Sequence, residues 1–263
     1  MKLVIFDMDG VLIRGKAAVE HAPEAVKSLQ NDGFLVRYLT NNSTQTPETY
    51  AERLEKVGIV AKPSEIMTSS IATARYLKEK SPNGGKALVV GGEGLSKALE
   101  DEGFTLVDYD DPSAVDFVTV GMDRNLTYDR LARAQHEIVV NHAEFIATNY
   151  DCMFPIENGG IKPGGGVIVK ALEVCTRQKA LVIGKPEPTS ILFILEECGI
   201  DPSDAAIVGD NLETDIPAGI SAGIRSIFVL TGIHGMKDIE SLDQDRTPDF
   251  ILKDLSTLME CLK

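Results

Sequence analysis

The start of the chain carries the feature that most constrains the fold. Residues 3–6 form an apolar run that passes directly into Asp7-Met8-Asp9-Gly10. A buried strand ending in two carboxylates places both at its carboxyl end, where open α/β sheets bind ligands. With one residue between them, one acid can act as a nucleophile while the other transfers a proton or helps to hold a metal ion. Asp and Gly are also common in local turns, so the motif alone leaves a purely structural role open.

Three further apolar runs also end in polar clusters, and each is predicted to be a strand. They are residues 35–39, 180–184 and 205–209. The clusters that follow supply hydroxyl and amide groups, a lysine ammonium and more carboxylates, on Thr40, Asn41, Asn42, Lys185, Asp210 and Asp215. Phosphoryl transfer depends mostly on positioning and neutralising a compact anion, a task that suits Lys and Mg²⁺. The four clusters together therefore indicate phosphoryl chemistry.

In type and order these four motifs resemble those of the haloacid dehalogenase superfamily. The chain is most similar to the NagD-like branch, which includes nitrophenylphosphatases, phosphoglycolate phosphatases and nucleotide monophosphatases. Further hallmarks of that branch are Arg14-Gly15, Gly121-Met122-Asp123-Arg124, and the segment from Thr148-Asn149-Tyr150-Asp151 to Gly166. The resemblance covers essentially all 263 residues.

The resemblance implies a role for each motif residue. Asp7 would be the nucleophile that becomes an aspartyl phosphate, and Asp9 the general acid and then the general base. The implied ligands of the phosphoryl oxygens are Thr40, the Asn41 and Asn42 segment that follows it, and Lys185. The implied Mg²⁺ ligands are the Asp7 carboxylate, the Asp9 main-chain carbonyl and Asp210, with Asp215 in support and Asn211 as a weaker candidate.

The second acid and one later loop bear on the substrate. A halide leaving group needs no proton, so the presence of Asp9 favours phosphate ester cleavage over dehalogenation. Asn149 and Asp151 lie in a segment expected to face the active site and to read the organic part of a small phosphorylated metabolite. A phosphotransferase or mutase, and a catalytically idle regulator that binds such metabolites, remain alternatives.

The helical and strand patterns predict an α/β fold with a Rossmann-like parallel-sheet core. Predicted core helices cover residues 23–32, 47–57, 188–198 and 216–222. About 140 residues separate Ser43 from Gly184, too many for one crossover, so an inserted smaller α/β cap is expected. We place the core at residues 1–80 and 179–263 and the cap at 81–178. Cap strands are predicted at 87–91, 116–120 and 144–148, and cap helices at 95–102, 128–140 and 167–175.

Composition excludes several classes of partner. A net charge of −14 without clustered Lys and Arg argues against nucleic-acid binding. There is no apolar stretch near the roughly 20 residues that span a bilayer, and no signal-like segment, so no membrane partner and a cytoplasmic location are expected. The four cysteines are widely spaced and are expected to be reduced. A homo-oligomer formed through the cap is also compatible with the resemblance.

Overall fold

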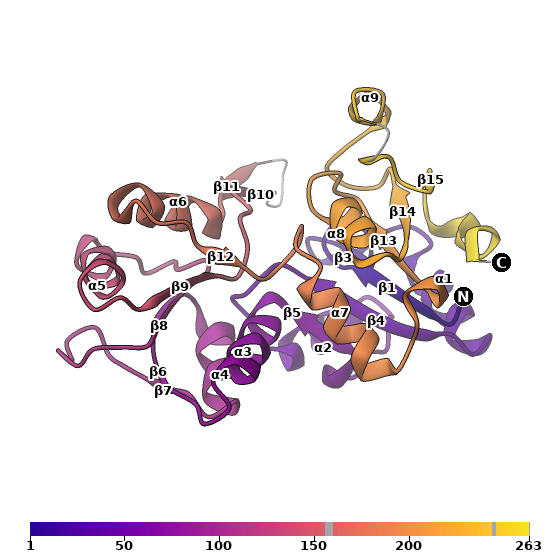
Figure 1. Cartoon of the computed structure of the whole chain (residues 1–263). Coiled ribbons are helices and arrows are strands. Elements are labelled where there is room, and N and C mark those ends of the chain that lie inside the picture. Colours follow the sequence, from indigo (N-terminus) through magenta and orange to yellow (C-terminus); the bar gives the residue numbers. More distant parts are fainter. Residues whose placement is uncertain (156–159, 244–245, 263) are drawn as a thin grey trace. The chain divides into compact units, whose positions relative to one another are not determined.

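The computed structural model describes residues 1–155, 160–243 and 246–262. Its chain divides into two compact units (Figure 1). The first comprises Met1–Thr40, Pro47–Met67 and Lys185–Lys263, and the second comprises Asn41–Thr46 and Thr68–Gly184. Each unit is built on its own sheet.

The first unit is organised around a six-stranded sheet in the order β15-β14-β13-β1-β4-β5. The strands are β1 (Leu3–Asp7), β4 (Leu35–Thr40), β5 (Ile66–Thr68), β13 (Ala205–Gly209), β14 (Arg225–Val229) and β15 (Phe250–Leu252). From β15 to β4 every neighbouring pair is parallel. Because β1 is central and all five of its residues are buried, its sequence is a continuous apolar run rather than an alternating one.

Helices cover both faces of this sheet. Val4 and Phe6 share one buried cluster with α1 (Ala22–Asn31), α2 (Pro47–Lys56) and the 3₁₀ segment η5 (Leu255–Leu262). On the other face, α7 (Thr189–Cys198) and α8 (Asp215–Ala222) lie side by side (Figure 1). Successive side chains of a strand point to opposite faces, so the apolar residues of β1 pack against both helical layers.

The second unit has a five-stranded sheet in the order β12-β9-β8-β6-β7. Its strands are β6 (Lys86–Val90), β7 (Thr105–Leu106), β8 (Phe117–Val120), β9 (Glu144–Ala147) and β12 (Leu181–Val182), and all of their pairings are parallel. The core of this unit forms where α5 (Tyr128–Val139) and α6 (Gly165–Thr176) pack on the sheet.

Shorter elements complete both units. In the second, α3 (Ser69–Lys80) packs against α4 (Glu93–Asp101), and β10 (Met153–Pro155) pairs antiparallel with β11 (Ile161–Pro163). The first also contains β2 (Ile13–Arg14), β3 (Ala17–Ala18), η1 (Pro63–Glu65), η3 (Pro202–Asp204) and α9 (Met236–Ile239). Within the described residues, no helix is both long enough and apolar enough to cross a membrane.

The predicted α/β class with parallel sheets is confirmed, and the predicted helices and strands are all present, with ends that shift by a few residues. One strand prediction was wrong about its sheet. Residues 180–184 were expected to form a core strand, but β12 pairs with β9 of the second unit. A two-residue strand carries no sequence signal for the sheet it will join, because pairing is decided by distant partners.

The division of the structure also differs from the expected boundaries at residues 81 and 178. That boundary placed residues 69–80 in the core, yet they form α3, which belongs to the second unit and packs against α4. The short segment Asn41–Thr46 belongs there as well. Chain connectivity alone does not reveal either assignment.

Candidate active site

A buried group of four charged side chains lies at the carboxyl end of the core sheet. Asp7 is the last residue of β1, and Lys185 begins the return of the chain into the first unit. The Lys185 ammonium donates to Asp7 Oδ1 at 2.5 Å and to Asp215 Oδ1 at 2.5 Å. Asp210 directly follows β13, and its carboxylate lies with those of Asp7 and Asp215 so that one oxygen of each is within 4.8 Å of the others.

Asp215 is held by main-chain donors as well as by Lys185. Its Oδ2 accepts hydrogen bonds from Asp210 N–H at 3.1 Å and from Asn211 N–H at 3.0 Å. Asp215 is also the first residue of α8, where a carboxylate interacts favourably with unpaired amides and the positive end of the helix dipole. Both of its oxygens are therefore engaged with protein groups, which suits a supporting role beside the other two carboxylates.

The three carboxylates of Asp7, Asp210 and Asp215 carry more negative charge than the Lys185 ammonium neutralises. Burial raises the pKa of Asp7 well above its usual value; Lys185 opposes this shift, while Asp215 and Asp210 add to it. Burial, with Asp215 beside it, also raises the pKa of Asp210 to about 7. Burial alone would lower the pKa of Lys185, but Asp215 and Asp7 outweigh it, so the ammonium stays charged. Three carboxylates against one ammonium give a site that favours a hard cation with oxygen ligands.

Asp9 occupies a different environment from Asp7. Its side chain is 49% exposed, and its Oδ1 accepts a hydrogen bond from Arg53 of α2 at 3.4 Å. The Arg53 guanidinium also stacks over the ring of buried Tyr50, 5.4 Å from the centroid. Solvent therefore reaches the Asp9 carboxyl, whereas Asp7 is buried. The sequence gives no indication of this contact, because nothing in the pattern of α2 distinguishes Arg53 from a solvated helix residue.

Thr40, Asn42 and Asn211, which the sequence also predicts as site residues, lie at or just after the ends of strands β4 and β13. Asp7 is opposite Leu39 in the parallel register, so buried Thr40 ends β4 at the same edge of the sheet. The Asn42 side chain accepts hydrogen bonds from the N–H and hydroxyl of Thr44, at 3.0 and 2.7 Å. Similarly, Asn211 Oδ1 accepts from Glu213 N–H at 2.8 Å. Both asparagine side chains thus stabilise local turns, a role typical of Asn.

A second polar group forms within the second unit. Asp151 Oδ2 accepts hydrogen bonds from Asn149 Nδ2 at 2.7 Å and from Asn41 Nδ2 at 2.9 Å. Asn149 Oδ1 in turn accepts from the Thr148 hydroxyl at 2.9 Å. The structure therefore brings together three predicted substrate-binding residues from two distant parts of the chain, Asn41, Asn149 and Asp151. The four core residues Asp7, Lys185, Asp210 and Asp215 form a separate group.

The loop that carries Asn149 and Asp151 is supported by α6. The glycines that open α6 allow its first turn to approach the Tyr150–Asp151 backbone, where a Cβ on Gly164 or Gly166 would overlap a main-chain oxygen. The Tyr150 hydroxyl donates to Glu173 on the same helix. Residues 156–159 of the predicted 148–166 specificity segment lie outside the described residues.

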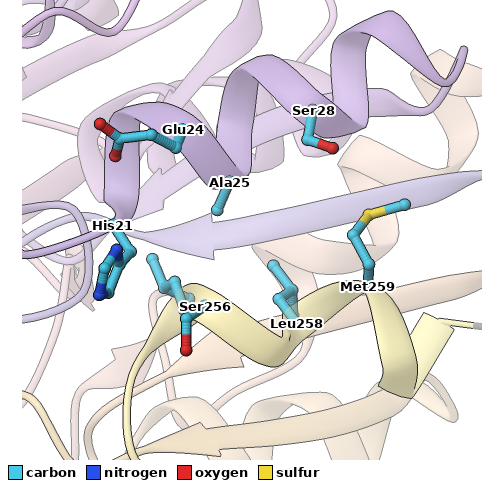
Figure 2. A pocket seen from close by; sticks show the side chains of 8 residues that line it. His21, Glu24, Ala25, Ser28, Ser256, Leu258 and Met259 are labelled. Carbon is cyan, nitrogen blue, oxygen red and sulfur yellow. The ribbon is translucent and has the colours of Figure 1, made fainter.

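A groove of about 250 Å³ lies elsewhere in the first unit, between α1 and η5. Figure 2 shows Glu24 and Ser28 of α1 on one side, with His21 just before the helix, and Ser256 and Met259 of η5 on the other. None of the four motifs contributes to its lining. Its walls combine polar and apolar side chains and contain no lysine, arginine or aspartate, so the groove differs in chemistry from the Asp7 group.

Comparison with known proteins identifies the family of this chain. A model described as haloacid dehalogenase-like hydrolase matches residues 4–105, and a second model of HAD-like hydrolases matches residues 182–258. The acid sugar phosphatase of Staphylococcus saprophyticus is 38% identical over 262 residues, which cover 100% of this chain and 98% of the relative. The chain belongs to the haloacid dehalogenase-like hydrolases.

Solved structures of this hydrolase family agree with that membership. NagD of Escherichia coli is similar with a TM-score of 0.87 and 35% identity, over 97% of each chain. The glycerol phosphate phosphatase of Mycobacterium tuberculosis, solved in complex with magnesium, has a TM-score of 0.90 and 28% identity, over 98% of this chain and 76% of its own. The predicted membership of the superfamily and of its NagD-like phosphatase branch is confirmed.

Proposed function

We propose that this hydrolase cleaves small phosphate monoesters in a Mg²⁺-dependent reaction that passes through a phosphoryl group on Asp7. The observation that carries the proposal is the placement of the Lys185 ammonium between Asp7 and Asp215, with Asp210 completing three close carboxylates. A nucleophilic carboxylate beside a fixed cation is suited to attack a phosphate, because the cation neutralises charge on the transferring group.

The proposed reaction has two steps. An Asp7 oxygen attacks phosphorus, forming the Asp7–phosphorus bond as the ester oxygen leaves, and Asp9 donates a proton to that oxygen. A water molecule then attacks the same phosphorus and loses a proton to Asp9, and the bond to Asp7 breaks to release inorganic phosphate. The accessibility of Asp9 supports this assignment, since its carboxyl must receive and return one proton in each turnover.

The donor set of the site fits a magnesium ion. Asp7, Asp210 and the Asp9 main-chain carbonyl would hold it, with Asp215 supporting through Lys185 or a water molecule. All are oxygen donors, and Mg²⁺ prefers a few carboxylates plus water and substrate oxygens. When bound, the ion would neutralise the charge of the phosphoryl group as it is transferred. The magnesium complex of the mycobacterial relative supports the same choice of metal.

The phosphoryl oxygens would be held by Lys185, the Thr40 hydroxyl and the Asn41–Asn42 segment. Hydroxyl, amide and ammonium groups donate hydrogen bonds, which the oxygens of a phosphate accept. We assign recognition of the organic group to Asn149 and Asp151. Their hydrogen-bonded arrangement with Asn41 supports this, because mutually held amide and carboxylate groups can pair with substrate hydroxyls at low entropic cost.

Phosphorylated sugars and small polyols are the substrate class that the relatives favour, with phosphoglycolate and nucleoside monophosphates as further candidates. One relative is named acid sugar phosphatase and another glycerol phosphate phosphatase. Nitrophenyl phosphate should serve as an artificial substrate. The cytoplasmic location and an oligomer formed through the second unit stay predictions.

The deciding experiment measures inorganic phosphate and remaining ester together, over a panel of these metabolites with Mg²⁺. A phosphatase releases one phosphate for each ester consumed. A mutase would consume or isomerise the ester without equivalent phosphate release, and an idle regulator would bind a metabolite while leaving it intact. Either of these results would refute the proposal.

A further inference from the structure

The carboxylate of Asp210 lies in a narrow space between two glycines. Gly10, with φ of +94°, is the last residue of the Asp7-Met8-Asp9-Gly10 motif, and Gly232 belongs to the loop after β14. A Cβ added to either residue would overlap the Asp210 carboxylate. Only hydrogen atoms fit at these two positions, so the backbone on both sides restricts where the carboxylate can lie.

The loop after β14 also makes a directed contact with Asp210. Ile233 N–H donates a hydrogen bond to Asp210 Oδ2 at 2.9 Å. This bond matters because Asp7 and Asp215 repel the Asp210 carboxylate and would favour its rotation away from them. A main-chain donor cannot rotate as a side chain does, so it fixes one oxygen and thereby orients the other.

Thr231 and His234, on either side of Gly232 and Ile233, link the same loop to the segments that follow β1 and β13. The Thr231 hydroxyl donates to the Gly10 carbonyl at 2.7 Å, and the Thr231 carbonyl accepts a hydrogen bond from Arg14. On the other side, His234 Nδ1 accepts from Leu212 N–H at 3.2 Å. Four consecutive residues therefore each contact the segment that follows β1 or the segment that follows β13.

We propose that residues 231–234 are a positioning element that holds the Asp210 carboxylate in the orientation needed to bind the metal ion. The inference rests on the proposed magnesium site. Partners that surround metal ligands orient them and raise affinity, and here three kinds of contact act on one ligand: close packing by Gly232, the hydrogen bond from Ile233, and the link from His234 to the Asp210 segment. In this role Gly232, Ile233 and His234 act through Asp210 and its segment, and Thr231 ties the loop to Gly10.

The first test is the binding of Mn²⁺ alone to metal-free protein, measured by the electron paramagnetic resonance signal of the free ion. In Gly232→Ala the new methyl group must displace the Asp210 carboxylate, so Mn²⁺ affinity should fall by about tenfold or more. Gly235→Ala is the matched control in the same loop, because its Cβ would lie 4.0 Å from the nearest atom, Asp238 Oδ2. That control should bind Mn²⁺ as the wild type does.

The second test uses His234, for which a conservative rescue exists. His234→Ala removes the acceptor for Leu212 N–H and should weaken Mn²⁺ binding, whereas His234→Asn places an amide oxygen near the position of Nδ1 and should restore it. The same ranking should appear in the Mg²⁺ concentration that gives half-maximal activity. This pair keeps the test decisive even if Gly232→Ala fails to fold.

Two outcomes separate this inference from the proposed function. If the wild type binds Mn²⁺ and both Gly232→Ala and His234→Ala bind it equally well, the positioning role is wrong and the metal site stands. If the wild type does not bind Mn²⁺, the proposed metal site itself is wrong, and the inference falls with it. A folded His234→Asn that binds as weakly as His234→Ala would also exclude the role assigned to the Nδ1 acceptor.

Discussion

Replacing Glu173 with Gln should remove a pH-dependent part of the stability of the second unit. The Glu173 side chain is 4% exposed and receives hydrogen bonds from Lys170 at 3.0 Å, Lys179 at 3.1 Å and the Tyr150 hydroxyl. Burial acts to raise the pKa of Glu173, but the hydrogen bonds from Tyr150, Lys170 and Lys179 outweigh it and lower the pKa from 4.5 to about 2.

The size of the effect follows from that difference. The pKa is lower in the folded protein, so the ionised carboxylate stabilises the fold above pH 4.5, and this contribution is lost as pH falls toward 2. A difference of one pKa unit between the folded and unfolded states corresponds to about 1.36 kcal/mol. The ionised carboxylate therefore contributes about 3 kcal/mol to the free energy of unfolding at pH 7. Between pH 7 and pH 3.5 this contribution should shrink by about 1 kcal/mol.

Urea unfolding followed by far-ultraviolet circular dichroism and tyrosine fluorescence measures this contribution. Glu173→Gln keeps the shape of the side chain and an acceptor for Tyr150 but loses the charge. The free energy of unfolding should fall by about 3 kcal/mol at pH 7, and the gap to the wild type should narrow at pH 3.5. Glu100→Gln, at an exposed position of α4, is the control and should change little. A gap that is absent at pH 7, or equally large at both pH values, would refute the reasoning.

Three further predictions concern catalysis. Chelation should abolish turnover and added Mg²⁺ restore it, because the carboxylate group cannot accept a phosphate dianion unneutralised; full activity in chelator would exclude the metal. Asp9→Ala should lower kcat for alkyl phosphates far more than for nitrophenyl phosphate, whose leaving group needs no proton. Equal losses in kcat for both substrates would contradict the acid role. Asn149→Ala or Asp151→Ala should change the ranking of substrates by kcat/KM, whereas Asn83→Ala, at an exposed position, should leave the ranking unchanged. If kcat/KM fell by the same factor for every substrate, a specificity role would be excluded.

The core strands could be predicted because their signal is local. Buried β1 and β13 are continuous apolar runs that end in acidic residues, and both properties are visible in the sequence. The position of β12 could not be predicted, because two residues carry too little pattern to specify a partner and its pairing with β9 depends on the rest of the second sheet. The same holds for α3, whose assignment follows from its packing on α4.

The candidate site shows a similar division. Asp7, Lys185, Asp210 and Asp215 were found from motifs, and the structure places them in one buried group. The surrounding contacts had no such signal. His234 stands 24 positions after Asp210 in the chain, and the Ile233 contact uses a main-chain N–H that any residue but proline would supply. A residue that positions a metal ligand through its main chain can be of almost any type, so its identity does not reveal this role.

The central claim is that the Asp7 carboxylate accepts the phosphoryl group of the substrate. Chemical trapping of the phosphorylated aspartate tests this claim most directly. Enzyme mixed briefly with nitrophenyl phosphate and Mg²⁺ is quenched in acid and treated with borohydride, which reduces an acyl phosphate to an alcohol and converts the aspartate to homoserine. Peptide mass spectrometry then locates the change. We expect homoserine at position 7, dependent on substrate and absent from Asp7→Asn. Modification of another residue, or none in enzyme that is turning over, would contradict the claim.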